Sequence, residues 1–331
     1  MFFPQSRLFV AGNPKAAGTS LRWWLLSVHG VDVGEQTSGS LWGESAPFQT
    51  VWDARVSLEY TWNSLSDDAR HDALTATDVL TVNPIRHPAS RAFSAWAGKY
   101  LALEPSYHER LPDGFDAPPQ IIESASQITE LFERFVRTLA VQSRQGAGWA
   151  EFDVHFWPQC RLLGRVARGT TMILRQESMS AGLEEIIAHL GRYGIDAPPM
   201  PRINENVVSY QPDLVSDEAG ALVAELYAED YAAFGYTEAL PTARAGDVDL
   251  EWLNDVRGRN RRYGVIHRAA MEARRHIQAL EKELEVGRGQ VRAAEIHQQA
   301  VLSSRSWRVT RPVRWASDQT SRVRSRLRRD P

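Results

Sequence analysis

The chain has 331 residues and a mass of 37.2 kDa, enough for one large domain or for one domain with an appendage. With 43% apolar and 24% charged residues, its composition is that of a globular protein and excludes a fibrous chain or one that is disordered throughout. A single cysteine, Cys160, excludes a disulfide framework and a cysteine-based metal site, and it is typical of a reducing compartment.

The charge is distributed unevenly along the chain. Residues 1–240 carry 18 Lys and Arg against 30 Asp and Glu, a net charge of −12, whereas residues 241–331 carry 20 against 11, a net charge of +9. The sequence therefore predicts an acidic body with a basic tail. Lysine is rare, because only Lys15, Lys99 and Lys282 occur among the 38 basic residues.

Short apolar runs alternate with longer segments of helical spacing in the body. We expect buried strands at 8–12, 78–85 and 170–174, and helices over 20–28, 89–102, 125–143, 181–193 and 216–233. Strands that alternate with helices favour an α/β fold of three layers with a mostly parallel central sheet.

The sequence changes character after the body, which we place at residues 1–240. Residues 241–264 are predicted to be a linker. Residues 265–300 carry apolar side chains at alternating spacings of three and four, which predicts an amphipathic helix and a weak, Ala-rich coiled coil interrupted at Gly287. Residues 301–331 form a basic tail with nine arginines and two aspartates.

A loop that could bind an anion links the first predicted strand to the first helix. Residues 13–21 read Asn-Pro-Lys-Ala-Ala-Gly-Thr-Ser-Leu. The three small residues after Lys15 let the backbone approach a ligand, and Gly18 can take a positive φ. Amides at a helix start point toward an anion, Lys15 adds a mobile charge, and Thr19 and Ser20 add hydroxyl donors. A capped helix start with a surface lysine is the alternative interpretation.

The position of Lys15 argues against a nucleoside-triphosphate loop of the Walker type. Such a loop places its lysine directly after the second glycine. Here Lys15 precedes Gly18 by three residues, and Thr19 follows that glycine. A kinase-like phosphotransferase is therefore a weaker alternative.

A second candidate anion site follows the second predicted strand. The run that starts at Arg86 contains Pro88, which can begin a helix, and places Arg91 and Ser94 three residues apart on one helical face. An arginine and a serine hydroxyl can hold one phosphate by charge-assisted hydrogen bonds. Two such sites at the carboxyl ends of two strands suit a ligand with two separated phosphates.

Both motifs resemble those of sulfotransferases. Residues 14–20 resemble the loop that binds the 5′-phosphosulfate, and the run Arg86-x-Pro88-x-x-Arg91-x-x-Ser94 resembles the 3′-phosphate motif, including its eight-residue interval. Weaker features agree in their order along the chain: residues 155–159, 174–177 and 227–236. The resemblance covers residues 6–237 and is greatest to the carbohydrate sulfotransferases, which include Golgi enzymes and bacterial relatives.

The resemblance implies a P-loop-like sulfotransferase domain over residues 1–240. It implies transfer of SO₃ from 3′-phosphoadenosine 5′-phosphosulfate (PAPS) to an acceptor hydroxyl, with adenosine 3′,5′-bisphosphate (PAP) as product and no metal. Lys15 would stabilise charge on the bridging oxygen as the sulfur–oxygen bond breaks. Arg86 and Ser94 would hold the 3′-phosphate, with Arg91 assisting them or buttressing the loop. The donor contacts implied for the first motif are Lys15, Ala16, Ala17, Gly18, Thr19, Ser20 and Leu21.

The acceptor hydroxyl also needs a general base. In relatives this is a histidine or a glutamate between the two phosphate motifs, and Glu59 lies nearest to that place. An exposed glutamate without a catalytic role is its alternative interpretation. His155 is the second candidate, and it could instead line the acceptor pocket with Phe156 and Trp157.

The expected acceptor is a glycan or a glycolipid, and the acidic body argues against nucleic acid as a partner. Residues 304–314 resemble a segment appended to enzymes of surface-polysaccharide assembly. Their arginines and tryptophan suit an anionic membrane surface or an envelope-assembly complex, and a solvated tail is the alternative. The preceding helix could join two copies of the chain weakly.

The start of the chain lacks the features of a signal peptide, and no run of 18 apolar residues occurs. We therefore expect a cytoplasmic protein that reaches the inner membrane surface through its tail, with residues 241–331 dispensable for the chemistry. A non-catalytic nucleotide-binding module that tethers partners is the third alternative.

Overall fold

The computed structural model describes residues 1–31, 65–104, 115, 118–163, 170–201, 206–242 and 246–327. The strands are β1 (Phe2–Phe3), β2 (Leu8–Val10), β3 (Leu80–Ile85) and β4 (Thr170–Arg175). The helices are α1 (Gly18–Val28), α4 (Asp67–Thr75), α5 (Pro88–Trp96), α6 (Ala125–Arg144), α7 (Gln159–Leu163), α8 (Met179–Gly191), α9 (Asp217–Leu226), α10 (Ala228–Phe234), α11 (Leu250–Ser303), α12 (Arg305–Val309) and α13 (Arg311–Leu327). In these ranges, every helix is too short or too polar to cross a membrane.

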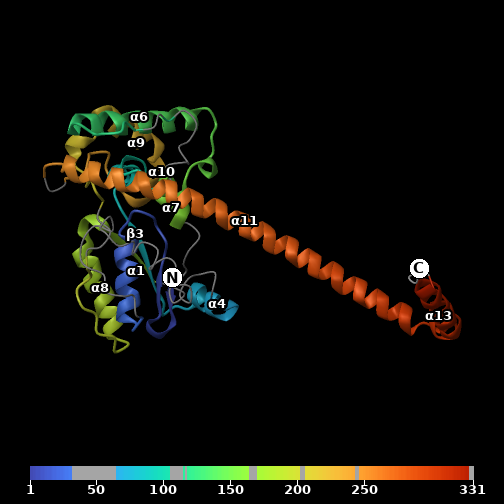
Figure 1. The fold of residues 1–331 in the computed structure, drawn as a ribbon. Coiled ribbons are helices and arrows are strands. Elements are labelled where there is room, and N and C mark those ends of the chain that lie inside the picture. Colours follow the sequence, from blue (N-terminus) through green and yellow to red (C-terminus); the bar gives the residue numbers. More distant parts are fainter. Residues whose placement is uncertain are drawn as a thin grey trace. The chain divides into compact units, whose positions relative to one another are not determined.

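The described strands form one sheet in the order β1-β2-β3-β4, and Figure 1 shows α1 and α8 beside β3. β1 runs antiparallel to β2, whereas β2, β3 and β4 are parallel, with Leu8 beside Leu80 and Leu80 beside Thr170. Parallel strands in register end at the same edge of a sheet, where α/β proteins commonly bind ligands. The predicted α/β class with a mostly parallel sheet is confirmed, and both candidate motifs follow strands at this edge.

Helices cover both faces of the sheet. Val10, Val82 and Leu174 pack with side chains of α1 and α8 in one buried cluster. Phe9 and Ile85, which point the other way, pack with residues of α4, α7 and α10 in a second cluster. Strands that are buried on both faces need apolar side chains in both directions. The sheet is therefore the middle one of three layers.

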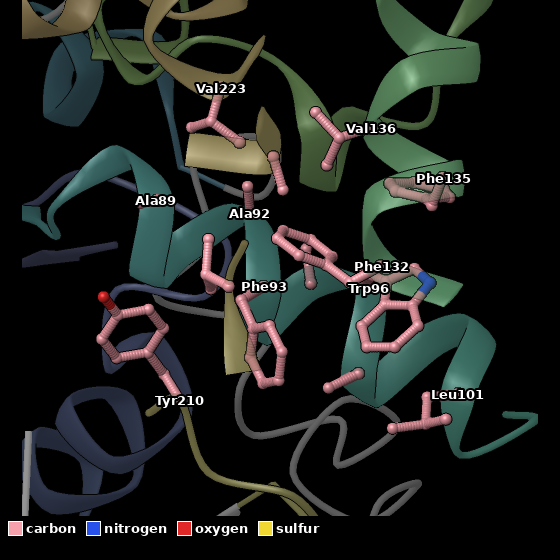
Figure 2. Packing of buried hydrophobic residues seen from close by; sticks show 14 of the residues in the cluster. Ala89, Ala92, Phe93, Trp96, Leu101, Phe132, Phe135, Val136, Tyr210 and Val223 are labelled. Carbon is pink, nitrogen blue, oxygen red and sulfur yellow. The ribbon is translucent and has the colours of Figure 1, made fainter. Parts of the chain in front are cut away.

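A third buried cluster joins α5, α6 and α9. Figure 2 shows its aromatic centre, where Phe93 of α5 lies edge-on to Phe132 of α6 with ring centroids 5.1 Å apart. Trp96 contacts the same Phe132 ring at 5.2 Å, and Val223 of α9 is fully buried in this cluster. Burial of one such side chain stabilises the fold by about 1.5–3 kcal/mol. Helix α5, which carries the second motif, is thus firmly anchored.

Two elements differ from the sequence predictions. The two-residue strand β1 is too short to show a periodic pattern, and it forms because Phe2 pairs with Phe9. The helix expected over 216–233 is interrupted at Tyr227, which separates α9 from α10. Tyr227 is buried and its hydroxyl donates a hydrogen bond to the Phe156 carbonyl at 2.8 Å, so tertiary contacts override the local helical pattern.

The chain divides into two compact units, Met1–Gly264 and Val265–Pro331. The first turns of α11 belong to the first unit, where Leu253 and Val256 are buried. Residues 250–264, which the sequence analysis assigned to a linker, are therefore helical and part of the body. Apolar side chains at i and i+3 give these turns a buried face, which a solvated linker lacks.

The second unit contains the remainder of α11 together with α12 and α13. Apolar side chains at heptad spacing along α11 are between 50% and 60% exposed: Ile277, Leu280, Leu284 and Val291. The basic tail is helical over α12 and α13. Its side chains include Trp307 and Trp315, which are 38% and 68% exposed.

Candidate active site

The loop between β2 and α1 has an unusual backbone. Lys15 and Ala17 adopt left-handed conformations, with φ of 67° and 58°. Each such residue with a Cβ costs about 1–2 kcal/mol, so neighbouring groups must hold the loop. Gly18, which can take a positive φ, does not do so here. It is the first residue of α1, where a Cβ would lie 3.4 Å from the Asn13 carbonyl oxygen, about the distance of an ordinary van der Waals contact.

The first turn of α1 suits an anion. Ala17 caps the helix without a side-chain hydrogen bond, and the turn contains no acidic residue. The partial positive charge of the helix start is therefore not neutralised by a carboxylate of this turn. Thr19 and Ser20 belong to it, whereas Leu21 is buried in the core and its amide donates to the Ala17 carbonyl at 3.0 Å. Ala16 is also fully buried, so Leu21 and Ala16 shape the loop from behind.

Arg91 of α5 holds this loop in place. Its side chain is buried, and its Nε donates to the Pro14 carbonyl at 3.0 Å while its Nη1 donates to the Trp157 carbonyl at 2.8 Å. Charge-assisted bonds to backbone carbonyls are strong enough to stabilise a strained turn. Of the two roles that the resemblance implies for Arg91, this geometry favours buttressing.

Arg86 leaves the end of β3 beside the loop. Its Nε donates to Ser90 Oγ at 2.9 Å, and its Nη1 lies 3.5 Å from the Lys15 carbonyl oxygen. Gln159 holds the Arg86 main chain, because its Oε1 accepts from the Arg86 amide at 2.9 Å and its Nε2 donates to the Arg86 carbonyl at 2.8 Å. Burial lowers the pKa of Arg86 to about 10, which leaves the guanidinium charged at neutral pH.

Ser94 lies one turn beyond Ser90 on the same face of α5. Its Oγ accepts from Asn206 Nδ2 at 2.6 Å, so its own O–H can donate to a ligand. Tyr210 is buried close enough to Arg86 to sense its charge, and its hydroxyl has no hydrogen-bond partner within the described part of the chain. A buried donor without an acceptor is uncommon, and a phosphate oxygen would satisfy it. The second motif thus fits an anionic ligand.

Lys15 extends to a π-helical turn that follows α5. The helix expected over 89–102 ends at Trp96, and the turn, η3 (Ala97–Leu101), replaces its last part. Lys15 Nζ lies directly against Gly98, because a Cβ at this glycine would be 2.6 Å from Nζ. Turns of this kind are frequent at functional sites. Gly98 therefore makes room for the ammonium group.

A buried ion pair adjoins this ammonium group. Lys99 Nζ and Glu104 Oε2 are 2.7 Å apart, with side chains 5% and 11% exposed. Burial and the positive charges of Lys99 and Arg86 lower the pKa of Lys15 to about 7, and the negative charge of Glu104 opposes this shift. Strongly perturbed pKa values are typical of functional sites. Lys15 therefore exchanges a proton near neutral pH, and a bound anion would favour its charged form.

His155 lies in a short turn, η5 (Val154–Phe156), and its Nδ1 is 2.5 Å from Asp153 Oδ1. Burial lowers the pKa of His155, Lys99 and Lys15 add to this shift, and Asp153 offsets only part of it. Burial raises the pKa of Asp153, but its hydrogen bonds from His155 outweigh that effect and the net shift is downward. An ionised Asp153 can only accept, so Nδ1 of neutral His155 donates and Nε2 is the basic nitrogen.

The other residues proposed around the acceptor have different positions. Glu59 lies outside the described residues. Phe156 is 1% exposed, and its ring stacks on Tyr100 at a centroid distance of 5.7 Å, so it belongs to the core and does not line a pocket. Trp157 is partly buried, and its Nε1 donates to the Phe152 carbonyl at 2.9 Å.

Two of the weaker sequence features, residues 155–159 and 227–236, contribute Gln159 of α7 and Asp230 of α10. These two side chains hold the loop that follows β2 and the turn that follows β3. Gln159, which fixes Arg86, also accepts from Asn13 Nδ2 at 2.9 Å. Asp230 is fully buried, and its carboxylate accepts from the amides of Gln159 and Cys160, each at 2.8 Å. This network joins the loop that follows β2, the turn that follows β3, and α10.

The weaker feature at residues 174–177, at the end of β4, supports the turn that follows β3 in the same way. Glu177 Oε1 accepts from the His87 amide at 2.6 Å, and the Tyr236 hydroxyl donates to Glu177 Oε2 at 3.1 Å. The His87 ring lies edge-on to Tyr236, with centroids 5.1 Å apart. All three weaker features therefore pack around the two candidate anion-binding motifs.

A sequence model of the sulfotransferase family matches residues 4–237, which is well over half of the chain. The chain belongs to the sulfotransferase family. This membership makes it a transferase of sulfur-containing groups and implies PAPS as the co-substrate, so the kinase-like alternative loses its support. A search of the curated proteins found no match, and neither did a search of the solved structures.

Sequence reasoning missed several residues of this candidate site. They are Gly98, Lys99, Glu104, Asp153 and Asn206. The rarity of lysine was a signal for Lys99, and the position of Asp153 two residues before His155 was a signal for that pair. Asn206 reaches Ser94 across 112 positions, and no sequence pattern indicates this contact.

Proposed function

We propose that this sulfotransferase moves a sulfuryl group from PAPS to a hydroxyl of a glycan or a glycolipid. The observation that carries the proposal is the position of Lys15. This lysine lies in a strained loop that suits an anion, and its ammonium group lies against Gly98 and near His155. The resemblance of both motifs to the carbohydrate sulfotransferases supports the choice of acceptor.

The two motifs supply separate contacts for the donor. The loop amides with Thr19 and Ser20 would hold the 5′-phosphosulfate at the start of α1. Arg86 and Ser94 would hold the 3′-phosphate, and the Tyr210 hydroxyl near Arg86 adds a further donor. The donor supplies an activated sulfuryl group, and the protein supplies the charges that stabilise its transfer.

The transfer forms a bond between the acceptor oxygen and sulfur and breaks the bond between sulfur and the bridging oxygen. His155 Nε2 takes the proton of the acceptor hydroxyl, while Asp153 holds the imidazole and stabilises its charged form. Lys15 stabilises the negative charge that develops on the bridging oxygen, which leaves with PAP. In a site with little water, such fixed charges act strongly.

The basic tail supports a peripheral site of action. Arg305, Arg308 and Arg311 lie on or between α12 and α13, and the Arg314 guanidinium lies 3.5 Å from the centre of the Trp307 ring. A basic, aromatic-containing surface of this kind binds anionic membranes. We propose that the tail brings the enzyme to a glycolipid acceptor at the inner membrane surface or in an envelope-assembly complex.

Exposed apolar residues on α11 also support weak pairing with a second copy. Arg274, Glu281, Arg288 and Glu295 recur at seven-residue intervals beside the Ile277–Val291 stripe and alternate in charge. Two antiparallel copies can therefore place opposite charges beside each other along the stripe. Sedimentation velocity over a concentration series tests this pairing, which Leu284→Asp should abolish.

Radiolabelled PAPS tests the function directly. The full chain is incubated with defined glycans, glycolipids and simple phenols, and separately with a cell-envelope extract, followed by mass analysis of labelled products. Label in a sugar hydroxyl that disappears in Lys15→Ala is the expected result. Label in phenols alone would overturn the acceptor assignment, and PAP binding without transfer to any acceptor would favour the non-catalytic alternative.

A further inference from the structure

The π-helical turn η3 ends without a following helix, so its last carbonyl groups need donors from outside the turn. The amides of residues 102–104 donate to the carbonyls of Ala97, Tyr100 and Lys99, whereas the carbonyls of Leu101 and Ala102 accept from another segment. Helix α11 supplies these donors. Arg257 Nη1 donates to the Leu101 carbonyl, and Asn260 Nδ2 donates to the Ala102 carbonyl at 2.8 Å. Arg257 Nη2 also donates to the Pro119 carbonyl. The first turns of α11 therefore hold the end of η3.

Arg257 is unusual for a residue in a segment that was predicted to be a linker. It is fully buried, and Asn260 is 8% exposed. Burial lowers the pKa of Arg257 to about 10, and the charge of Arg261 adds to this shift. Burial of a charged group is costly unless hydrogen bonds satisfy it, and the planar guanidinium reaches two carbonyls that a lysine could not bridge.

The same turn contacts Lys15, the proposed catalytic lysine. Gly98 of η3 contacts Lys15 Nζ, and Lys99 of η3 forms the buried ion pair with Glu104. A displacement of η3 would move both the backbone against which Lys15 lies and the positive charge beside it. The hydrogen bonds that Arg257 and Asn260 donate to the Leu101 and Ala102 carbonyls oppose such a displacement.

We propose that Arg257 and Asn260 are positioning residues for Lys15 and act by holding η3. The kinetic part of this inference rests on the proposed sulfuryl transfer. Both residues lie beyond residues 4–237, which the family model matches. This chain therefore uses a helix outside that match to hold the turn against which Lys15 lies. The dispensable part of the C-terminal region then begins after Gly264, where the second unit starts.

Asn260→Ala is the most informative substitution, and Asn254→Ala is its matched control. Asn254 lies on the same helix and is bonded to backbone as well, but to the amide and carbonyl of Ile122, at 2.9 and 2.8 Å. Asn260→Ala should lower kcat at least about 10-fold with PAP affinity changed less than twofold, because misplacement of a catalytic group by ~1 Å can cost up to about 100-fold. Asn254→Ala should leave kcat per folded molecule unchanged.

A lysine titration gives a readout that does not depend on turnover. Within the described part of the chain, the charged groups that face Lys15 are Lys99, Glu104 and Arg86, and the titratable His155 also lies near it. Because the chain has three lysines, ¹³C-labelled lysine side chains can be assigned by Lys→Arg substitutions and titrated by NMR, with exposed Lys282 as reference. Asn260→Ala should raise the pKa of Lys15 from about 7 toward 10.5, since a less firmly held η3 lets water reach the ammonium group.

Arg257→Lys is the second variant, because it keeps the positive charge but loses the planar guanidinium that donates to two carbonyls at once. It should change kcat and the pKa of Lys15 in the same directions, with thermal unfolding as the check on folding. Equal kcat and equal Lys15 pKa in Asn260→Ala and Asn254→Ala would overturn the proposal. If the unmodified chain sulfates no acceptor, the proposed function fails, and the NMR titration alone still decides whether Asn260 acts on Lys15.

Discussion

Lys15 Nζ lies so close to Gly98 that a Cβ at this glycine would be 2.6 Å from it. The obstructed atom is the end of a flexible side chain, so Gly98→Ala should displace the ammonium group without unfolding the protein. We expect kcat to fall by about 10- to 100-fold, because the charge no longer meets the bridging oxygen.

Steady-state kinetics and thermal unfolding test this substitution together. Gly191→Ala is the control, since Gly191 ends α8 with no neighbouring atom within 4 Å of its Cβ position. That variant should keep kcat and the unfolding temperature. Normal turnover in Gly98→Ala would show that the position of Lys15 Nζ is unimportant for the reaction.

Lys15→Ala should reduce turnover far more than donor binding. The lysine charge matters most when the leaving oxygen becomes negative, and loss of such a stabilising group typically costs about 100- to 1,000-fold in rate. Single-turnover kinetics with radiolabelled PAPS measure the rate, and calorimetry with PAP measures binding. Near-normal turnover would mean that the first loop has no catalytic role.

Arg86→Ala and Ser94→Ala should weaken PAP binding much more than binding of adenosine 5′-monophosphate, which lacks the 3′-phosphate. A hydrogen bond to a charged group contributes about 1.5–3 kcal/mol, and Arg86 and Ser94 each offer one. Tyr210→Phe should show the same selectivity, because it removes only the buried hydroxyl near Arg86. Calorimetry with both nucleotides compares the losses, and equal losses would assign these residues to the fold.

The pH dependence of kcat/KM should be bell-shaped. His155 must be neutral to accept a proton, and burial lowers its pKa, so activity falls only as the pH drops through a value below 6.5. Lys15 must be protonated, so activity falls as the pH rises through about 7, the pKa that burial gives it. In kcat the second limb should move to higher pH, since bound donor phosphates favour charged Lys15.

Asp153→Asn tests the assignment of the acidic limb. Asp153 opposes the downward shift of the His155 pKa, so its removal should move the acidic limb to lower pH. It should also lower kcat/KM, because an amide replaces the ionised acceptor of the Nδ1 proton, and its NH2 group can donate to Nδ1 and so place the proton on Nε2. A rate profile with an unchanged acidic limb would remove His155 from the reaction.

The basic tail should bind anionic vesicles reversibly. Each basic residue near such a surface contributes about 1 kcal/mol, and the attraction weakens as salt shortens the Debye length. Arg305→Glu with Arg311→Glu in the full chain should abolish sedimentation with anionic vesicles and leave transfer to a soluble acceptor unchanged. Arg274→Glu with Arg288→Glu makes the same charge change on α11, and equal losses in both pairs would show that the tail has no special role.

Much of the fold could be predicted from local pattern. The strands β2, β3 and β4 are apolar runs bounded by turn residues, and the loop at Lys15 and the Arg86–Ser94 run are short motifs within one segment each. Buried strands and helix-start anion sites depend on residues that are close in sequence, so their physics is visible there. The same is true of the charge division between the body and the tail.

The tertiary structure decided which of these residues act together. The left-handed backbone of this loop lies at Lys15 and Ala17 and not at Gly18, and Arg91 of another helix holds the loop through the Pro14 carbonyl. The end of α5 became a π-helical turn whose carbonyls are met by Arg257 and Asn260, more than 150 positions away. Local propensity carries no information about such partners, because a buried donor can satisfy any carbonyl that the packed chain brings within reach. The sequence by itself thus determined the two motifs that we expect to bind anions, and the packed structure decided how Lys15 is held.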